Sequence, residues 1–356
     1  MPSISFYDPQ RSYEYNFIEG PFGIFADGKV TKERGKPKYK FFGQPVYLPF
    51  GIPAGPLVNG AYCKAALDHG FDIVVYKTVR TKRLIVHPWP NVLSLSIKGD
   101  LTEEKAQKGV VGHHSYKYPL SITNSFGVPS FDPSFWQKDL AETVKYAKSG
   151  QVVVGSFQGT VNPEHNKTKY LKDFVLAARL VKETKVKVME VNLSCPNEGH
   201  SNMLCYDIDT TFKIANAIKN EIGNTPLILK LAYFHNHQHL DDFVKKLGKI
   251  VEGFAAINTL PAKIIDDKGG RALPGDGRDT SGVCGSAIKW AGIDMVGRLS
   301  KYREELGYKY KIVGVGGVMK AKDYRDYIKV GADAVMSATG AMWNPMLAQE
   351  IKKSIK

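Results

Sequence analysis

The segments KIVGVGG (311–317) and DAVMSAT (333–339) are short runs of small and β-branched apolar residues. A strand without alternating polar residues is buried on both faces, as parallel strands covered by helices are. Six more segments have the same character: VYLPFGIP (46–53), DIVVYKT (72–78), QVVVGSF (151–157), KVMEVNL (187–193), PLILKLA (226–232) and FAAINT (254–259). Amphipathic helical patterns follow most of them, so the sequence predicts the α/β class and a (β/α)8 TIM barrel.

The connections between these strands differ greatly in length. Apolar residues at i, i+3 and i+4 predict helices at 132–150, 166–184, 209–223 and 286–306. Residues 79–131, after the second strand, and 260–285, after the sixth, are too long for ordinary connections, and we expect lid or insertion loops there. We therefore divide the chain into an N-terminal extension (1–44) and a barrel domain (45–356).

The composition is that of a globular protein. Of the 356 residues, 43% are hydrophobic and 24% charged, and no apolar run approaches the length of a membrane span. The first residues lack the basic start and apolar core of a signal peptide. Four cysteines without CxxC spacing predict neither a disulfide framework nor a metal site. We expect a cytoplasmic protein with free thiols.

The formal net charge of +14 would attract anionic ligands, nucleic acid or an acidic surface. The basic residues are spread along the chain, with one cluster at 28–40, so we interpret most of them as a solvated surface. We expect no nucleic-acid or membrane partner, and a small-molecule substrate instead.

Polar residues follow the strands at the end where barrel enzymes place their active sites. Lys77 and Lys230 lie in otherwise apolar strands, where a charge is costly unless an anion accompanies it. Gly316 and Gly317 follow the seventh strand, and Thr339 ends the eighth. Loops at these two places commonly bind phosphate through backbone N–H groups. The pattern predicts a phosphorylated ligand or cofactor.

A cysteine between two asparagines directly follows the fourth strand. Asn192 and Asn197 flank Cys195, while Asn124 lies in the first long insertion and Asn258 at the end of the sixth strand. A single asparagine is usually a turn or capping residue. Four amides on one predicted rim, each a donor and an acceptor, favour a heterocycle with alternating C=O and N–H groups.

These residues resemble a known family. The shared motifs, in the same order, are YKT (76–78), NSFGVP (124–129), NLSCPN (192–197), LKLAY (229–233), INT (257–259) and VGVGGV (313–318). Together they resemble dihydroorotate dehydrogenase over roughly residues 45–350. The cysteine is typical of the soluble class 1 enzymes, with class 1A closest, whereas class 2 enzymes carry serine. The resemblance implies FMN-dependent oxidation of dihydroorotate to orotate in pyrimidine biosynthesis, fumarate as acceptor, and a cytoplasmic homodimer.

The resemblance also implies roles for individual residues. Cys195 would remove a proton from C5 of dihydroorotate while a hydride passes from C6 to N5 of FMN. Lys77 would meet the substrate carboxylate and the flavin, and Lys230 the flavin N1/O2 edge. The other implied substrate contacts are Asn124, Phe126, Gly127, Val128, Asn192, Asn197, Asn258 and Thr259. The implied cofactor contacts are Ala54, Gly55, Lys77, Thr78, Asn192, Lys230, Ile257, Ser281, Gly282, Gly316, Gly317, Ala338 and Thr339.

The sequence departs from the family pattern in places. Ala338 stands where Gly is frequent, and Ser130 where a second asparagine is usual. The first insertion is long, and the N-terminal extension has no recognised counterpart. A paralogue acting on another cyclic amide therefore stays open. So does NAD as acceptor, which would require a partner subunit carrying FAD and an iron–sulfur cluster.

Two other functions fit part of the sequence pattern. A tRNA dihydrouridine synthase is also a flavin barrel with a catalytic cysteine, and the positive charge would suit RNA binding. Its cysteine typically lies in a GCP motif, whereas this chain has SCP between asparagines, and we recognise no additional RNA-binding domain. A flavin-binding protein without catalysis would have no need of Cys195 and the two lysines.

Overall fold

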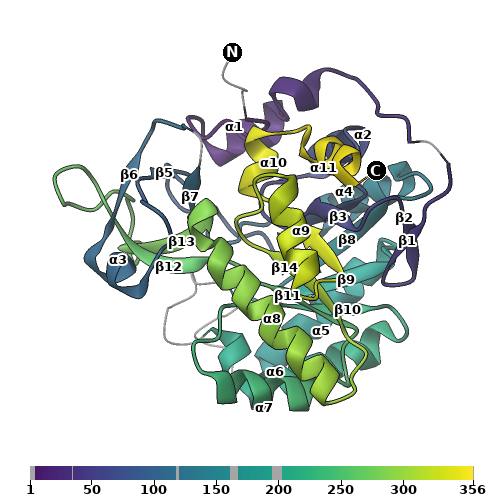
Figure 1. Cartoon of the computed structure of the whole chain (residues 1–356). Helices are drawn as coiled ribbons and strands as arrows, with labels where there is room; N and C mark the ends of the chain where they lie inside the picture. Colours follow the sequence, from purple (N-terminus) through teal and green to yellow (C-terminus); the bar gives the residue numbers. More distant parts are fainter. Residues whose placement is uncertain (1–4, 34, 118–119, 161–166, 195–202, 356) are drawn as a thin grey trace.

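The computed structural model describes residues 5–33, 35–117, 120–160, 167–194 and 203–355, and it confirms the (β/α)8 barrel (Figure 1). Eight parallel strands close in chain order, and β15 pairs back onto β3. They are β3 (Phe50–Ile52), β4 (Ile73–Val79), β8 (Val152–Phe157), β9 (Val188–Asn192), β10 (Leu227–Leu231), β11 (Gly253–Ala256), β14 (Lys311–Val315) and β15 (Ala334–Met336). Each overlaps a segment predicted as a strand, although β4 extends one residue beyond its segment, to Val79, and β11 begins one residue before its segment, at Gly253.

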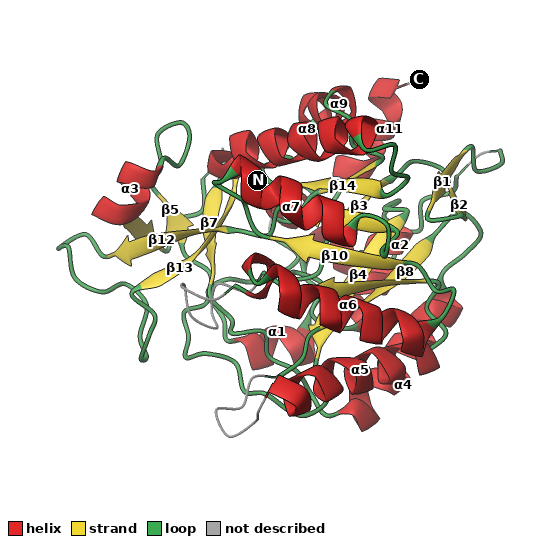
Figure 2. Cartoon of the chain, turned by 90° about the horizontal axis from the view of Figure 1, so that it is seen from below, coloured by secondary structure: helices red, strands yellow, loops and turns green. Residues whose placement is uncertain are grey.

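Helices cover the outside of the barrel (Figure 2). The main ones are α2 (Gly60–Asp68), α4 (Pro133–Tyr146), α5 (Lys167–Glu183), α6 (Ile208–Ile222), α7 (His237–Leu247), α8 (Lys289–Glu305), α9 (Ala321–Lys329) and α11 (Leu347–Ile355). The four helices predicted by periodicity correspond to α4, α5, α6 and α8. A short 3-10 turn, η4 (Ser286–Ile288), precedes α8, and another, η3 (Leu204–Tyr206), precedes α6. No helix among the described residues is long and apolar enough to cross a membrane.

The two long connections fold together instead of forming irregular loops. The first contributes β5 (Ser94–Leu95), α3 (Glu103–Lys108), β6 (Val110–His113) and β7 (Ser121–Asn124). The second contributes β12 (Leu260–Ile265) and β13 (Thr280–Gly285). Their strands close into one sheet in the order β12-β13-β7-β5-β6, which we call the insertion sheet. Because β13 pairs with β7, Gly282 lies opposite Asn124, and residues of both insertions meet above the barrel.

The N-terminal extension contacts both ends of the barrel. A hairpin of β1 (Tyr39–Phe41) and β2 (Gln44–Val46) spans the predicted boundary between the extension and the barrel domain. It packs Phe41 and Val46 against the valines inside the barrel, where the strands begin. The hairpin and the insertion sheet therefore lie at opposite ends (Figures 1 and 2). Before the hairpin come α1 (Tyr13–Glu19) and η1 (Gly23–Ala26). Phe6 stacks on Phe25 with ring centroids 4.5 Å apart, and its N–H donates to Met342 O at 3.1 Å.

Candidate active site

A cavity lies between the strand ends of the barrel and the insertion sheet. It encloses about 750 Å³, part of it open to solvent, which is within the usual size of small-molecule sites. Predicted residues that line it are Ala54, Gly55, Asn124, Phe126, Lys230, Ile257, Asn258, Thr259, Gly316, Gly317, Ala338 and Thr339. An adjoining hollow shares Lys230, Asn258 and Thr259 with it and adds Lys77, Thr78, Val128 and Asn192. The structure thus brings most of the predicted residues into one continuous space.

Some predicted residues lie elsewhere. Ser281 and Gly282 do not line the cavity, whereas Cys284 and Gly285, farther along the same strand, do. A Cβ at Gly282 would lie 2.2 Å from Thr259 Oγ1, so Gly282 allows close packing behind the cavity wall. Gly127 packs against His87 rather than facing the cavity. Cys195 and Asn197 lie outside the described residues, so their roles stay predictions.

The amide side chains at the strand ends form a hydrogen-bond network with one another and with neighbouring protein groups. Asn192 Nδ2 donates to Gln158 Oε1 at 2.8 Å, and Asn192 Oδ1 accepts from Asn258 Nδ2 at 3.3 Å. Asn258 Nδ2 also donates to the backbone oxygen of Ser194 at 3.0 Å. Both amide orientations are therefore fixed by protein partners. A rigid rim of this kind pre-organises the residues that would bind a flat polar ring.

The two predicted lysines are buried, and a carboxyl group lies near one of them, Lys230. Lys77 is 7% exposed and Lys230 5% exposed. Glu190, on the neighbouring strand β9, is 1% exposed, and burial raises the pKa of its carboxyl group, although the charge of Lys230 acts in the opposite direction. Ser156 Oγ donates to Glu190 Oε1 at 3.1 Å. Glu190 therefore compensates part of the Lys230 charge, and both lysines line the hollow in which an anionic ligand could bind.

Glu190 is not among the site residues predicted from the sequence, although the sequence contains a feature that points to it. It is the single carboxylate in the apolar strand KVMEVNL, two residues before Asn192. Alternation in a strand places these two residues on the same face. A charged residue inside such a strand is as unusual as Lys77 and Lys230 are in theirs.

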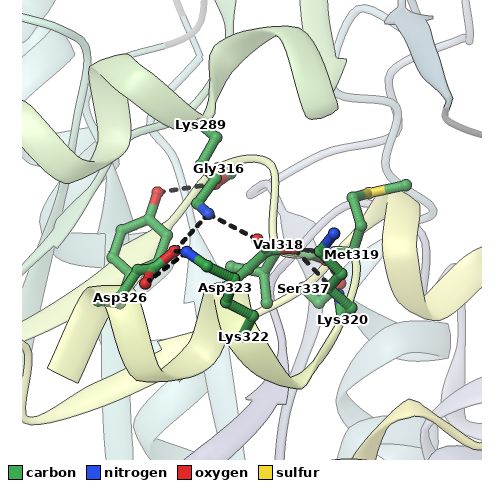
Figure 3. Close-up of polar contacts among 10 residues, drawn as sticks. Lys289, Gly316, Val318, Met319, Lys320, Lys322, Asp323, Asp326 and Ser337 are labelled. Carbon is green, nitrogen blue, oxygen red and sulfur yellow. Dashed lines mark hydrogen bonds and ion pairs between the residues drawn. The ribbon is translucent and has the colours of Figure 1, made fainter.

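The loop after β14 suits a phosphate group. Gly317 has φ of +64°, and a Cβ there would lie 2.6 Å from Lys289 Cβ, so no other residue fits without rearrangement. Ser337 Oγ donates to Val318 O at 2.6 Å, which ties this loop to the one after β15 (Figure 3). Gly316, Gly317 and Thr339 all line the cavity. Backbone atoms of two adjoining loops can thus approach one anion.

Several residues that sequence reasoning did not assign to the site also line this cavity, and Tyr7 and Cys284 are two of them. Tyr7, from the N-terminal extension, packs edge-on against Phe126 with ring centroids 5.8 Å apart. Cys284 lies on β13, and burial raises the pKa of its thiol to about 11, while the Thr339 hydroxyl and the Lys230 charge lower it. Neither residue had a motif around it that would have signalled its place.

Arg278 holds the insertions in position. Its guanidinium donates to the backbone oxygens of Pro88, Pro90, Ser125 and Pro274 at 2.5–3.1 Å. Its pKa is lowered to about 10 by burial, which leaves the group charged at neutral pH. One buried side chain therefore joins three separate segments around the site.

Arg278→Ala is expected to lower the free energy of unfolding by about 2–4 kcal/mol, because several buried carbonyl oxygens lose a charged donor. Chemical denaturation measures this loss, and limited proteolysis should cut the insertions faster. Arg271→Ala is the matched control, since Arg271 pairs with Asp279 on the exposed side of the same insertion. An equal loss in both variants would contradict a special role of Arg278.

Comparisons with known proteins agree with this architecture. The sequence model of the family described as dihydroorotate dehydrogenase matches residues 38–356. A dihydroorotate dehydrogenase from Dictyostelium discoideum is 36% identical over 360 residues, covering 97% of this chain and 95% of that relative. The catalytic subunit of dihydroorotate dehydrogenase B (NAD(+)) from Staphylococcus carnosus is 32% identical over 182 residues, 51% of this chain and 56% of its own length. The corresponding subunit from Desulforamulus reducens is 27% identical over 235 residues, 65% of this chain and 71% of its own.

The full-length match and the family model confirm the resemblance drawn from the motifs and favour it over the tRNA-modifying alternative. The chain is an enzyme, and it belongs to the dihydroorotate dehydrogenase family.

Proposed function

We propose that this enzyme oxidises dihydroorotate to orotate with FMN as its cofactor, using Cys195 as the base. The observation that carries the proposal is the continuity of one cavity. Buried Lys77 and Lys230 and the amide network lie at one part of it, and the Gly316–Gly317 loop lines another. An anionic heterocycle and a phosphorylated cofactor would therefore lie side by side.

The residues of the chain supply binding, orientation and proton transfer. FMN, when bound, would accept the hydride that leaves C6 of the substrate. Lys77 would hold the substrate carboxylate, and the amides of Asn124, Asn192 and Asn258 would hold the ring. Cys195 Sγ would take the proton from C5, for which a base must lie within hydrogen-bond reach. The positive charge of Lys230 would stabilise negative charge on the cofactor.

An anaerobic optical experiment tests the proposal. The purified protein should absorb at about 450 nm, as oxidised flavins do, and dihydroorotate should bleach this band within seconds. If the protein carries flavin but dihydroorotate does not bleach it, the proposed substrate is wrong, whereas the proposed flavin cofactor is supported. A colourless protein that does not take up added FMN would overturn the cofactor as well.

A second substrate class has one observation in its favour. Ser130, which stands where a second asparagine is usual, has its hydroxyl occupied by the backbone: it accepts from Arg80 N at 3.0 Å and donates to Phe131 O at 2.9 Å. One expected substrate contact is therefore engaged elsewhere. If dihydroorotate does not bleach the flavin, other dihydropyrimidines and cyclic amides are the next substrates to assay.

The acceptor and the assembly are further parts of the proposal. We propose fumarate as acceptor and a cytoplasmic homodimer, on the strength of the class 1A resemblance. The NAD(+)-linked names of several relatives make NAD the alternative. Rapid reoxidation of the reduced enzyme by fumarate alone would support the first. Failure of fumarate would favour NAD, whose test must include the partner subunit that carries FAD and the iron–sulfur cluster. Light scattering of the purified protein tests the dimer.

Cys284 offers a test of where the cofactor lies. Its thiol should react slowly with iodoacetamide at neutral pH, because the raised pKa of about 11 keeps it protonated. Labelling should become faster by about tenfold per pH unit between about pH 7 and about pH 9, since only the thiolate reacts. FMN should slow labelling of the apoprotein, as measured by peptide mass spectrometry. Equal labelling with and without FMN would show that the thiol does not face the cofactor.

A further inference from the structure

A buried carboxylate lies directly behind the glycine loop that follows β14. Asp323, on α9, is 4% exposed. Its Oδ2 accepts from the backbone N–H groups of Met319 at 2.9 Å and Lys320 at 3.1 Å (Figure 3). Its Oδ1 accepts from Lys289 Nζ at 2.6 Å. One carboxylate thus fixes the end of the loop and is itself held by a lysine from α8.

Lys289 contacts the same loop through its main chain. A Cβ at Gly317 would come within 2.6–2.9 Å of the Cβ, Cα and N atoms of Lys289. Its side chain also donates to Asp326 Oδ2 at 2.7 Å. Burial lowers the pKa of Lys289, but the two carboxylates outweigh burial and the pKa is raised overall. The lysine is therefore a charged anchor between the loop and α9.

The loop has further partners on its protein side. Tyr327 OH donates to Gly316 O at 2.7 Å, and Ser337 Oγ donates to Val318 O at 2.6 Å. Together with Asp323, these bonds engage the carbonyls of Gly316 and Val318 and the N–H groups of Met319 and Lys320. The loop is held from behind, while Gly316, Gly317 and Val318 line the cavity.

We propose that Asp323 is a positioning residue for cofactor phosphate. It would act through the loop, holding the backbone in the shape that receives the phosphate, without touching the ligand. The inference rests on the proposed FMN function. The cavity side supports it. Among the described residues that line the part of the cavity with the glycine loop, Lys230 is the sole lysine or arginine, and Lys77 lines the adjoining hollow. A phosphate at the loop would therefore depend on backbone N–H groups.

A simpler role must be separated from this one. Asp323 is the third residue of α9, and it accepts from the backbone N–H of Lys320, as an acidic residue of a helix N-terminus often does. If it only stabilised α9, its loss would weaken the fold without regard to the phosphate. The phosphate is the part of the ligand that distinguishes FMN from riboflavin, so these two probes separate the two roles.

The experiment compares Asp323→Asn with Asp326→Asn in the full-length apoprotein. Asp326 is on the same helix and pairs with Lys289 and Lys322, but the bonds to Met319 N and Lys320 N belong to Asp323. Titration with FMN and with riboflavin, followed by flavin fluorescence, gives both affinities. We expect Asp323→Asn to weaken FMN binding by about tenfold to a hundredfold. Riboflavin binding should change by less than about twofold, and Asp326→Asn should change neither beyond that.

The outcomes that overturn the inference are distinct. Unchanged FMN affinity in Asp323→Asn, or an equal loss for FMN and riboflavin, would leave Asp323 a purely structural residue. Lys289→Gln is the second variant if Asp323→Asn does not fold. It keeps the bonds from Asp323 to the loop but removes the anchor, and it should show the same selective loss of FMN affinity. A wild-type protein that binds neither flavin would overturn the proposed function itself, and with it this inference.

Discussion

An enzyme with Cys195 replaced by alanine is expected to keep its flavin and to lose nearly all reduction of that flavin by dihydroorotate at neutral pH. A positioned general base contributes about 10²–10⁴-fold to such a proton transfer, so the rate of bleaching should fall by that factor. Flavin content should stay the same, because the residues expected to hold the cofactor are other ones. Anaerobic stopped-flow absorbance measures the rate.

The matched control is Cys205→Ala, in the same part of the chain. Cys205 is fully buried, and burial raises the pKa of its thiol to about 12, so it has no prospect of acting as a base at neutral pH. Once folding of the Cys205→Ala enzyme is verified, dihydroorotate should reduce its flavin at the wild-type rate. A Cys195→Ala enzyme that reduces as fast as the wild type would show that the base is another group.

The second large effect is expected for Lys230→Met, which keeps the length of the side chain and removes its charge. Removing a group that stabilises developing charge costs about 10²–10³-fold in rate. The flavin reduction potential should also become more negative, because negative charge on the reduced cofactor loses its counterion. Rapid reduction kinetics and a dye-linked redox titration measure the two effects. Lys263→Met, at an exposed position, is the surface control.

Glu190 allows the catalytic effect of Lys230 to be separated from a loss of stability. The charge of Lys230 lowers the pKa of Glu190, so Lys230→Met should raise that pKa further and favour the protonated carboxyl group. Adding Glu190→Gln removes this buried acid and should recover stability lost in Lys230→Met. The rate and the reduction potential should not recover. If the rate and the reduction potential recover together with stability, Lys230 stabilises the fold and has no direct part in the chemistry.

The barrel was predictable because its strands are buried on both faces. Segments such as LILKL in β10 and IVVYKTV in β4 read as continuous apolar runs interrupted by one lysine, and that interruption itself marked the site. The glycines after β14 and the asparagines after β9 and β11 were visible for the same reason, since polar and glycine residues follow apolar strands there.

The insertion sheet and its contributions were not predictable in this way. Its strands are two to six residues long, and β13 finds its partner β7 more than 150 residues earlier in the chain. Only that pairing determines that Cys284, and not Ser281 or Gly282, lines the cavity. Arg278 and Tyr7 have no neighbouring motif, because their contacts are with segments far away in sequence.

The hydrogen bond between Phe6 N and Met342 O has a consequence for the order of events during synthesis. Tyr7 and Met342 both line the cavity, yet all eight barrel strands lie between them in the sequence. The wall that they share cannot form until all eight strands have been synthesised. A ligand that contacts this wall is therefore bound by a barrel whose strands are all present, and not by a shorter nascent chain.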